Sequence, residues 1–217
     1  MKTEEVAAWI IVLFFGIGLH EYAHCKVADM CGDPTARMQG RVTLNLFKHF
    51  EPVGVIMMVV SAFTGIGLGW GRAAPINPLK MKNERWDVFI SVAAGPISNF
   101  LQAVVYAIIF RILALTAPQV LPGFVGLLLV LGVYANLGLM IFNLIPFGPL
   151  DGHWLVGQLL PLEARLKWYR INRGIGFFGL IIAVTVCNQV AQNGGPDILG
   201  AIIEGPRVAI ARYLMGI

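Results

Sequence analysis

The stretch VAAWIIVLFFGIGLHEYAH, residues 6–24, places two histidines and a glutamate at the end of an apolar run. The apolar part contains no charged side chain, as expected for a helix that lies in lipid. His20, Glu21 and His24 then follow within about one turn. Ionisable side chains are expensive to hold at membrane depth, so those that occur there mark functional sites. We therefore expect a spanning helix from Val6 to about Ala28 with a functional site toward its C-terminal end.

Composition supports a membrane environment. Hydrophobic residues make up 57% of the 217 and charged residues only 13%, with a mean hydropathy of +0.74. A soluble domain has about 25% charged residues. The net charge of +4 comes from Lys and Arg in short loops beside apolar runs, where the positive-inside rule places them. We therefore expect residues 1–217 to form a single multi-pass domain in a lipid bilayer, with no nucleic-acid partner.

Three more apolar runs are long enough to predict spanning helices. They are Val88 to about Leu115, Val120–Asn143, and Ile171 to about Val190. A fourth run, Val53–Trp70, is interrupted by repeated glycines, and its uninterrupted part would rise only about 16 Å across a hydrocarbon core of about 30 Å. This run predicts a re-entrant or hairpin element that turns at the glycines.

The fold class predicted is therefore an all-α polytopic membrane protein with about four spanning helices and one hairpin element. Short membrane-associated β segments are expected at Arg41–Leu46 and Arg72–Pro78. Residues 165–217 are expected to hold the last span and an interfacial helix, because the tail mixes charged with apolar residues.

The histidine pair has the spacing of a metal site. Residues four apart share one face of a helix, so His20 and His24 can offer imidazole nitrogens to one ion. Glu21 is offset by about 100° and can hold a water without being a ligand. This is the arrangement of zinc hydrolases, in which the metal acidifies the water and the glutamate takes its proton. The alternative is a chance match of buried polar histidines.

A catalytic zinc needs a third protein ligand and an open fourth position. Asp151 and Glu51 are the acidic candidates near the end of another predicted span. Asp151 lies in FGPLDGH, where prolines and glycines break the helix that ends at Asn143. Such a break is tolerated at membrane depth where it lines a cavity, and it lets a carboxylate turn inward. The alternative role for Asp151 is an ordinary helix cap.

The pair HEYAH and NLIPFGPLDGH resembles the HExxH and NxxPxxxLDG motifs of the site-2 protease family, which are intramembrane zinc metalloproteases. The segments GDPTARMQGRVTLN, AAPINP and AGPISN are similar to its compact prokaryotic branch, which lacks PDZ and CBS domains; the resemblance covers about residues 12–160. It implies one Zn²⁺ per chain held by His20, His24 and Asp151. It also implies that Glu21 is the general base and that Asn143 helps to hold substrate or the oxyanion. The sequence departs from the family at His153, where relatives usually carry a small residue.

Cleaving a transmembrane helix requires that it unwind, because its carbonyls are bonded internally. An extended edge could capture the unwound segment by β-addition. We favour the AAPINP segment for this role and expect Asn99 to bond across helices or to contact substrate; His49 and Glu51 could border the site. The substrate-binding candidates are Ala74, Pro75, Ile76, Asn77 and Asn99.

The predicted function is cleavage of single-span membrane proteins or peptides. For the three ligands to meet, the first helix and Val120–Asn143 must run in the same direction, and Val88–Leu115 must run opposite. The basic loops then share one compartment with the site, which the positive-inside rule makes the cytoplasmic side of a prokaryotic cell (inner) membrane. The alternatives are a metal transporter, which would need polar residues strung across the bilayer, and a catalytically silent scaffold. No oligomeric state follows from the sequence.

Overall fold

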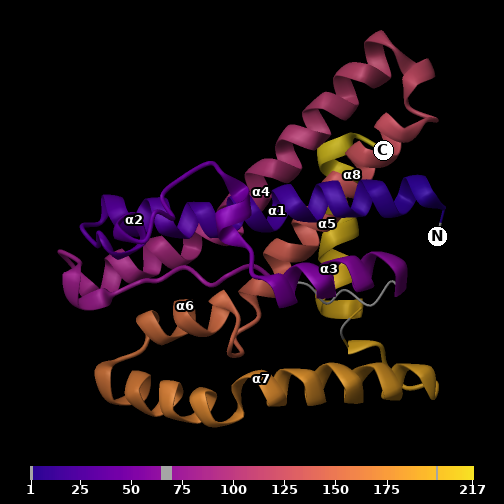
Figure 1. The fold of residues 1–217 in the computed structure, drawn as a ribbon. Coiled ribbons are helices and arrows are strands. Elements are labelled where there is room, and N and C mark those ends of the chain that lie inside the picture. The colour runs from indigo at the N-terminus through magenta and orange to yellow at the C-terminus, as the bar shows by residue number, and fades with distance from the viewer. Residues whose placement is uncertain (1, 65–69, 199) are drawn as a thin grey trace.

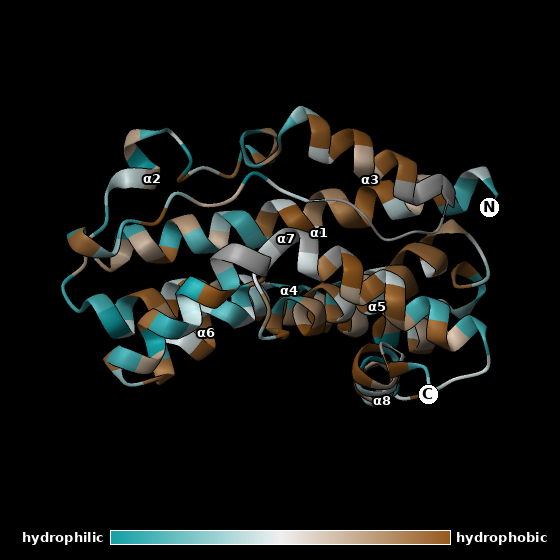
Figure 2. Ribbon diagram, turned by 90° about the horizontal axis from the view of Figure 1, so that it is seen from below, coloured by the Kyte–Doolittle hydropathy of each residue, from teal (hydrophilic) through white to brown (hydrophobic). Residues whose placement is uncertain are grey.

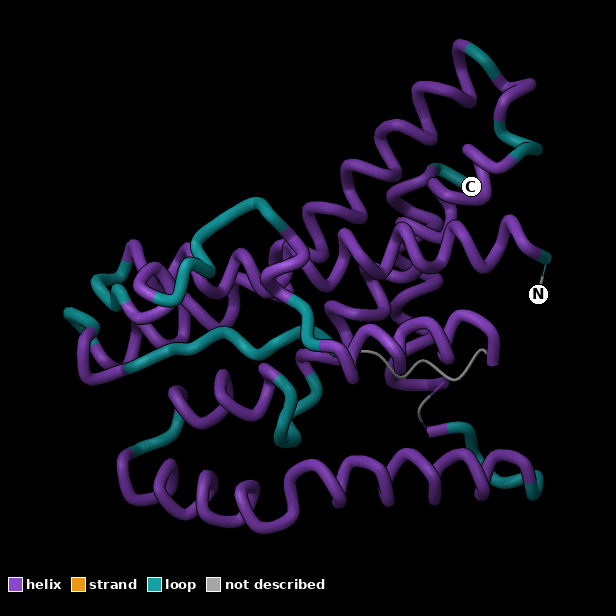
Figure 3. Tube along the Cα trace, viewed as in Figure 1, coloured by secondary structure: helices purple, strands orange, loops and turns teal. Residues whose placement is uncertain are grey.

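The computed structural model describes residues 2–64, 70–198 and 200–217 (Figures 1 and 3). This part of the chain folds into helices and loops and contains no strand. In chain order the elements are α1 Thr3–Met30, α2 Thr35–Met38, the 3-10 helix η1 Leu46–His49, α3 Pro52–Thr64, the 3-10 helix η2 Pro78–Lys80, α4 Glu84–Thr116, the 3-10 helix η3 Pro118–Val120, α5 Phe124–Leu144, α6 Asp151–Leu159, α7 Leu162–Gln192, the π-helix η4 Gly200–Glu204 and α8 Gly205–Met215.

Three of these helices, α1, α4 and α5, are long and apolar enough to cross a membrane. They coincide with the first three predicted spans and identify a membrane protein. Helix α4 packs along both α1 and α5, and α1 also packs on α5. In Figure 2 hydrophobic residues dominate the half of the molecule that holds the N-terminus, and hydrophilic residues gather around α2 and α6. The core of the fold is thus a three-helix membrane bundle with a polar end.

The directions of these helices agree with the parity expected from the sequence. His24 bonds to Ser91 near the start of α4, whereas Gly16, two turns earlier in α1, bonds to Asn99, two turns later in α4. Helices α1 and α4 are therefore antiparallel. Only the short segment 117–123 joins α4 to α5, and the two pack along each other, so they are antiparallel too. Helices α1 and α5 consequently run in the same direction.

The chain that leaves α3 returns to the end at which α3 begins. Helix α3 has 13 residues and lies beside α1 (Figure 1). A Cβ added to Gly54 would lie 2.1 Å from the carbonyl oxygen of Trp70, and the Trp70 indole donates to the Glu51 carboxylate. The chain thus enters and leaves at the same end of α3, which is the hairpin arrangement predicted. The glycines expected to make its turn lie mostly within residues 65–69, outside the described residues.

The β segments predicted from the sequence do not form among the described residues. Arg41–Leu46 runs through bends into η1, and 70–77 is a single extended segment without a ladder partner. Side chains, rather than a neighbouring strand, make hydrogen bonds to the backbone of residues 70–77. The Arg41 guanidinium donates to the carbonyls of Arg72 and Ala73, and Asp33 accepts from the N–H of Asn77. We call residues 70–77 the return segment.

The C-terminal third packs on the bundle through α6 and α8, and α7 packs on α6. The fourth predicted span, Ile171–Val190, falls in α7, where the side chains of several residues lie outside those described, and it is not confirmed as a span. Helix α7 packs on α6 and lies apart from α1 in Figure 1. Helix α8 lies crosswise to α1 (Figures 1 and 2) and closes a small apolar core with α4 and α5. That core consists of Ala103, Ala107, Val133, Leu137, Ala211 and Met215.

Candidate metal centre

Three side chains from the two motifs meet at the polar end of the bundle. The Nε2 atoms of His20 and His24 lie 3.0 Å apart. The Oδ2 atom of Asp151 lies 3.2 Å from His20 Nε2 and 3.4 Å from His24 Nε2. Both histidines are buried, and the Asp151 side chain is 17% exposed. The folded chain therefore brings Asp151 to the two histidines, which lie 127 and 131 residues earlier in the sequence, and so unites the three residues that the sequence singles out as ligands.

The partners of the other ring nitrogens define the chemistry of this cluster. His24 Nδ1 lies 2.8 Å from the Ser91 carbonyl oxygen, which can only accept a hydrogen bond. His20 Nδ1 lies 2.7 Å from Asn99 Oδ1. The amide nitrogen of Asn99 donates to the carbonyl of Gly16 and to Asn136 Oδ1, so its oxygen faces His20. In its neutral form each imidazole thus carries its proton on Nδ1 and presents the lone pair of Nε2 to the cluster.

When both rings are neutral, the lone pairs of His20 Nε2, His24 Nε2 and Asp151 Oδ2 therefore converge on one point. Asp151 Oδ2 is buried and has no hydrogen-bond donor among the described residues. Lone pairs at this separation repel unless a cation lies among them or a ring gains a second proton. A tetrahedral zinc ion with bonds of about 2.0–2.1 Å places its ligand atoms roughly 3.3 Å apart, close to the three separations found. Two imidazoles and one carboxylate are also a ligand set that suits zinc. The residues present fit a zinc ion.

The histidine side of the centre depends on a close helix contact. Gly95 of α4 packs directly against the two rings: an added Cβ would lie 2.3 Å from His24 Nε2 and 2.6 Å from His20 Cε1. Small residues allow such approach between membrane helices. Asn136 of α5 is fully buried and links Asn99 to the Gly132 carbonyl. Sequence reasoning missed Asn136, although a polar side chain inside an apolar span was a signal that could have found it.

The aspartate side is held by side chains of α4 and α7. Asp151 is the first residue of α6. Arg85 of α4 donates to the carbonyls of Gln158 and Leu159 at the other end of α6. From α7, Asn172 accepts from the N–H of Gly148, and the Trp168 indole donates to the His153 carbonyl. Helices α4 and α7 therefore fix the two ends of the segment that presents Asp151.

Glu21 lies beside the centre without joining it. Its Oε2 atom is buried and has no hydrogen-bond partner among the described residues. The carboxylate is near enough to His20, His24 and Asp151 to interact with them electrostatically. The backbone of the return segment lies against it: a Cβ on Gly71 would be 2.7 Å from Glu21 Cγ and 3.1 Å from Oε1. Glu21 thus lies between the metal-ligand cluster and the return segment.

Two of the other predicted site residues, Asn143 and Asn99, lie in the spanning helices α5 and α4. Asn143 is half-buried at the end of α5 and donates to the Leu139 carbonyl one turn earlier. Asn99 is fully buried and bonded across three helices, so it has no exposed surface for a substrate. The remaining candidates are partly exposed members of the return segment. They are Ala74, Pro75, Ile76 and Asn77.

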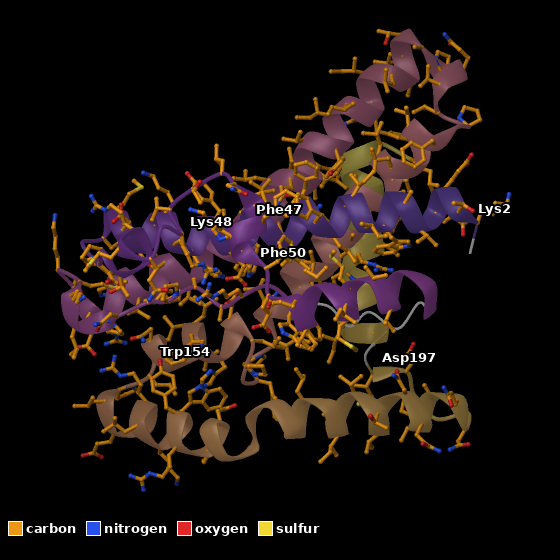
Figure 4. The ribbon with its side chains drawn as sticks, viewed as in Figure 1. Lys2, Phe47, Lys48, Phe50, Trp154 and Asp197 are labelled. Carbon is orange, nitrogen blue, oxygen red and sulfur yellow. The ribbon has the colours of Figure 1, made fainter. Side chains whose placement is uncertain are left out.

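The residues with no assigned role now have structural surroundings. His49 is fully buried, its Nε2 faces the Thr43 carbonyl, and its ring packs edge-on against Tyr22. His153 is packed among Trp154, Trp168 and Tyr169, in the space between α6 and α7 where Figure 4 labels Trp154. Burial lowers the pKa of both His49 and His153, so both rings stay neutral at pH 7. Neither belongs to the three-residue cluster.

A membrane bundle with a buried His-His-Asp centre and an adjacent glutamate defines the class of membrane metalloproteases. The sequence model of Peptidase family M50 matches residues 8–121, more than half of the chain. The chain belongs to peptidase family M50, the site-2 proteases, which confirms the resemblance drawn from the motifs. It is 35% identical over 161 residues to the Bacillus subtilis (strain 168) protein named "Putative zinc metalloprotease YwhC", covering 73% of this chain and 71% of that protein. No solved structure matches the chain significantly.

Proposed function

We propose that the chain is an intramembrane zinc endopeptidase that cleaves transmembrane or membrane-associated segments of other proteins. The observation that carries this proposal is the convergence of three ligand atoms, His20 Nε2, His24 Nε2 and Asp151 Oδ2, at 3.0–3.4 Å from one another. These residues would hold one zinc ion. When bound, zinc lowers the pKa of a water in its open position and polarises a peptide carbonyl.

The residues of the chain then have separate tasks. Ser91 and Asn99 orient the two imidazoles through Nδ1, which keeps each Nε2 free. Glu21 accepts the proton of the attacking water at its carboxylate and returns it to the departing amine. Asn143 is assigned to the substrate carbonyl or the oxyanion, since its amide is at the end of α5 just before the Asp151 loop. Removing one such donor costs about 100-fold or more in turnover.

The return segment supplies an edge for the unwound substrate. The N–H and C=O groups of Ala74 and Ile76 have no hydrogen-bond partner in the part of the chain that the structure describes. Such groups can pair with an extended peptide by β-addition. Gly71 of the same segment lies against Glu21, so a peptide bound along this edge would pass beside the base. We assign the substrate to this edge.

Zinc transport remains the competing function. It would require a polar route through the bundle beyond the cluster. Asn99 and Asn136 extend the polar zone by one layer. The next layer of α4, α5 and α8 is an apolar core that includes Ala103, Val133 and Ala211. Among the described residues the polar zone therefore ends one layer beyond the cluster, which favours a fixed catalytic ion over one in transit.

Site-directed variants test the assignment of roles. Glu21→Gln should abolish cleavage of single-span peptides by detergent-purified protein but leave its bound zinc nearly unchanged. His20→Ala, His24→Ala and Asp151→Ala should lose both zinc and cleavage. Zinc content is measured by mass spectrometry of the metal and cleavage by peptide products. Equal loss of zinc in the Glu21 variant would refute the division between base and ligands.

We also propose that the site faces the cytoplasm in the cell membrane of a prokaryote. The basic loops around it carry Arg37, Lys48 and Lys82, and positive loops stay on the cytoplasmic side. Single cysteines at Gln39 and Lys82, in a cysteine-free background, should both resist an impermeant reagent on intact cells and both react after lysis. Labelling of one but not the other on intact cells would contradict the hairpin and the shared direction of α1 and α5.

A further inference from the structure

Arg41 is a buried cation without a carboxylate partner. The residue is 2% exposed, and none of the ion pairs among the described residues includes it. Burying an unpaired charge costs free energy, so the hydrogen bonds that the Arg41 guanidinium makes must offset this cost. The turn at Gly40, where φ is +66°, and the bond from the Arg41 N–H to the Ala36 carbonyl fix its backbone just after α2.

The guanidinium binds two successive carbonyls of the return segment. Nη1 donates to the Ala73 oxygen at 2.6 Å and Nη2 to the Arg72 oxygen at 2.5 Å. The planar fork of arginine suits two acceptors held side by side, and a lysine ammonium could satisfy only one of them in that geometry. The Arg72 N–H is also held, by the His49 carbonyl at 2.8 Å. The backbone at residues 72–73 is thus fixed from the loop between α1 and α3.

That loop is in turn anchored on the helix that carries the histidines. The ring of Phe14 in α1 stacks on Phe50 with centroids 5.2 Å apart and contacts Phe47 at 5.1 Å. Figure 4 places Phe47 and Phe50 over α1. These contacts fix the loop that carries Arg41 against α1. Helix α1 also carries His20 and Glu21, so the Arg41 guanidinium and the site are held by the same helix.

The fixed carbonyls lie next to the point where the segment touches the base. Gly71 precedes Arg72, and its missing side chain leaves the space that Glu21 Cγ and Oε1 and the Ile17 side chain occupy. A shift of the backbone at Arg72 must therefore move the peptide against the Glu21 carboxylate. Arg41 also lies within electrostatic reach of Glu21.

We propose that Arg41 is a positioning residue for peptide cleavage. Its guanidinium, bonded to the carbonyls of Arg72 and Ala73, sets the position of the return segment relative to Glu21 and the metal centre. The inference rests on the proposed function, since it takes the return segment as the edge that binds substrate. Its consequence is that Arg41 determines which peptide bond of a bound segment is cut, although it touches neither substrate nor metal.

The test compares Arg41→Gln, Arg41→Lys and a matched control, Arg37→Gln, in zinc-loaded, detergent-solubilised protein. Arg37 lies in α2, four residues before Arg41, and its replacement removes the same charge, but its side chain is 65% exposed and pairs with Asp29. Three quantities are measured: zinc per chain, hydrogen exchange of the amides in residues 70–77, and the rate and position of cleavage of a single-span peptide.

Arg41→Gln should keep its zinc, and its amides in residues 70–77 should exchange faster. It should cleave the peptide about 100-fold more slowly, as expected for a misplacement of about 1 Å. Its cuts should be distributed over neighbouring peptide bonds. Arg41→Lys should fall between this variant and the wild type. Arg37→Gln should match the wild type in all three measurements.

Unchanged exchange in Arg41→Gln would overturn the clamp itself. A slower reaction at one unchanged bond, with zinc lost in the same proportion, would overturn the positioning role and leave only support of the fold. If the wild type cleaves no peptide, the proposed function fails, but the exchange comparison still tests whether Arg41 holds the return segment.

Discussion

The two halves of the metal centre are built in different ways. His20 and His24 lie inside the three-helix bundle, and fixed groups of α4 orient both rings. Asp151 stands on a short helix that is tied by individual side chains from α4 and α7. In the histidine half, close packing of the spanning helices holds the rings against α4, whereas individual side-chain hydrogen bonds hold the short helix of the aspartate half. Substitutions in the histidine half should therefore cause a large loss of zinc binding. Substitutions in the aspartate half should each cause a smaller, partial loss.

The largest effect is expected where the bundle touches the histidines. Gly95→Ala introduces a methyl group 2.3 Å from His24 Nε2, a contact that neither ring can accept without leaving the cluster. We expect loss of bound zinc and of cleavage, with the spans still folded. Metal analysis and circular dichroism of the purified variant check this. Retention of zinc would mean that α4 can move away and that the packing is looser than described.

The next effect concerns orientation of a ring without a clash. Asn99→Ala removes the acceptor for His20 Nδ1–H and the amide that donates to the Gly16 carbonyl and to Asn136 Oδ1. Loss of such a partner lowers metal affinity by roughly 10- to 100-fold. Competition with a chelator measures this affinity. An affinity equal to that of the wild type would show that Asn99 serves packing alone.

A smaller effect is expected on the aspartate half. Asn172→Ala leaves the buried N–H of Gly148 unpaired, at a cost of about 1–3 kcal/mol. Part of that loss is taken up by relaxation of the loop, and the bonds from Arg85 and Trp168 still hold α6. Zinc affinity should therefore fall less than in Asn99→Ala. The same chelator assay decides, and a larger loss than in Asn99→Ala would reverse the comparison between the two halves.

The smallest effect is a pH response at the far end of the return segment. Burial alone would raise the pKa of Asp33, but hydrogen bonds from Thr35 and from the N–H of Asn77 lower it below its ordinary value. A depressed carboxyl pKa stabilises the fold above the unfolded value of about 3.9, and that contribution is lost as the pH falls through the folded pKa. Amide exchange at Asn77 should accelerate below about pH 4.

Asp33→Asn is the control for this pH response, because its side-chain amide cannot ionise. Exchange at Asn77 in this variant should be faster than in the wild type at pH 7 and nearly independent of pH after correction for intrinsic rates. If the wild type and Asp33→Asn gave exchange profiles of the same slope, Asp33 would not be the anchor of the segment.

The sequence predicted the centre itself because local rules determine it. Helical spacing places His20 and His24 on one face, and the breaks around Asp151 require a loop. The need for these residues to meet then determines the directions of α1, α4 and α5. The hairpin followed from helix length and glycine spacing. None of these steps requires knowledge of which side chains touch across the bundle.

Other features depend on contacts between distant segments. The expected strands failed because an extended run becomes a strand only with a partner, and the Arg41 and Asp33 side chains occupy that position. The contacts that link Asn136 and Gly95 to the histidines depend on the placement of α4 and α5 beside α1. Asn99 was predicted to bond across helices, and it does, but its full burial was not apparent from its helix alone.

The most direct measurement is zinc K-edge X-ray absorption of the wild type and of Glu21→Gln, each purified with zinc. We expect one zinc per chain in both proteins, with two imidazole nitrogens and a carboxylate oxygen at about 2.0–2.2 Å and no sulfur. The spectra should retain these three protein ligands when Glu21 is replaced, while peptide cleavage disappears. A sulfur ligand, a single imidazole, or the loss of a protein ligand in Glu21→Gln would contradict a centre made of His20, His24 and Asp151 with Glu21 as its base.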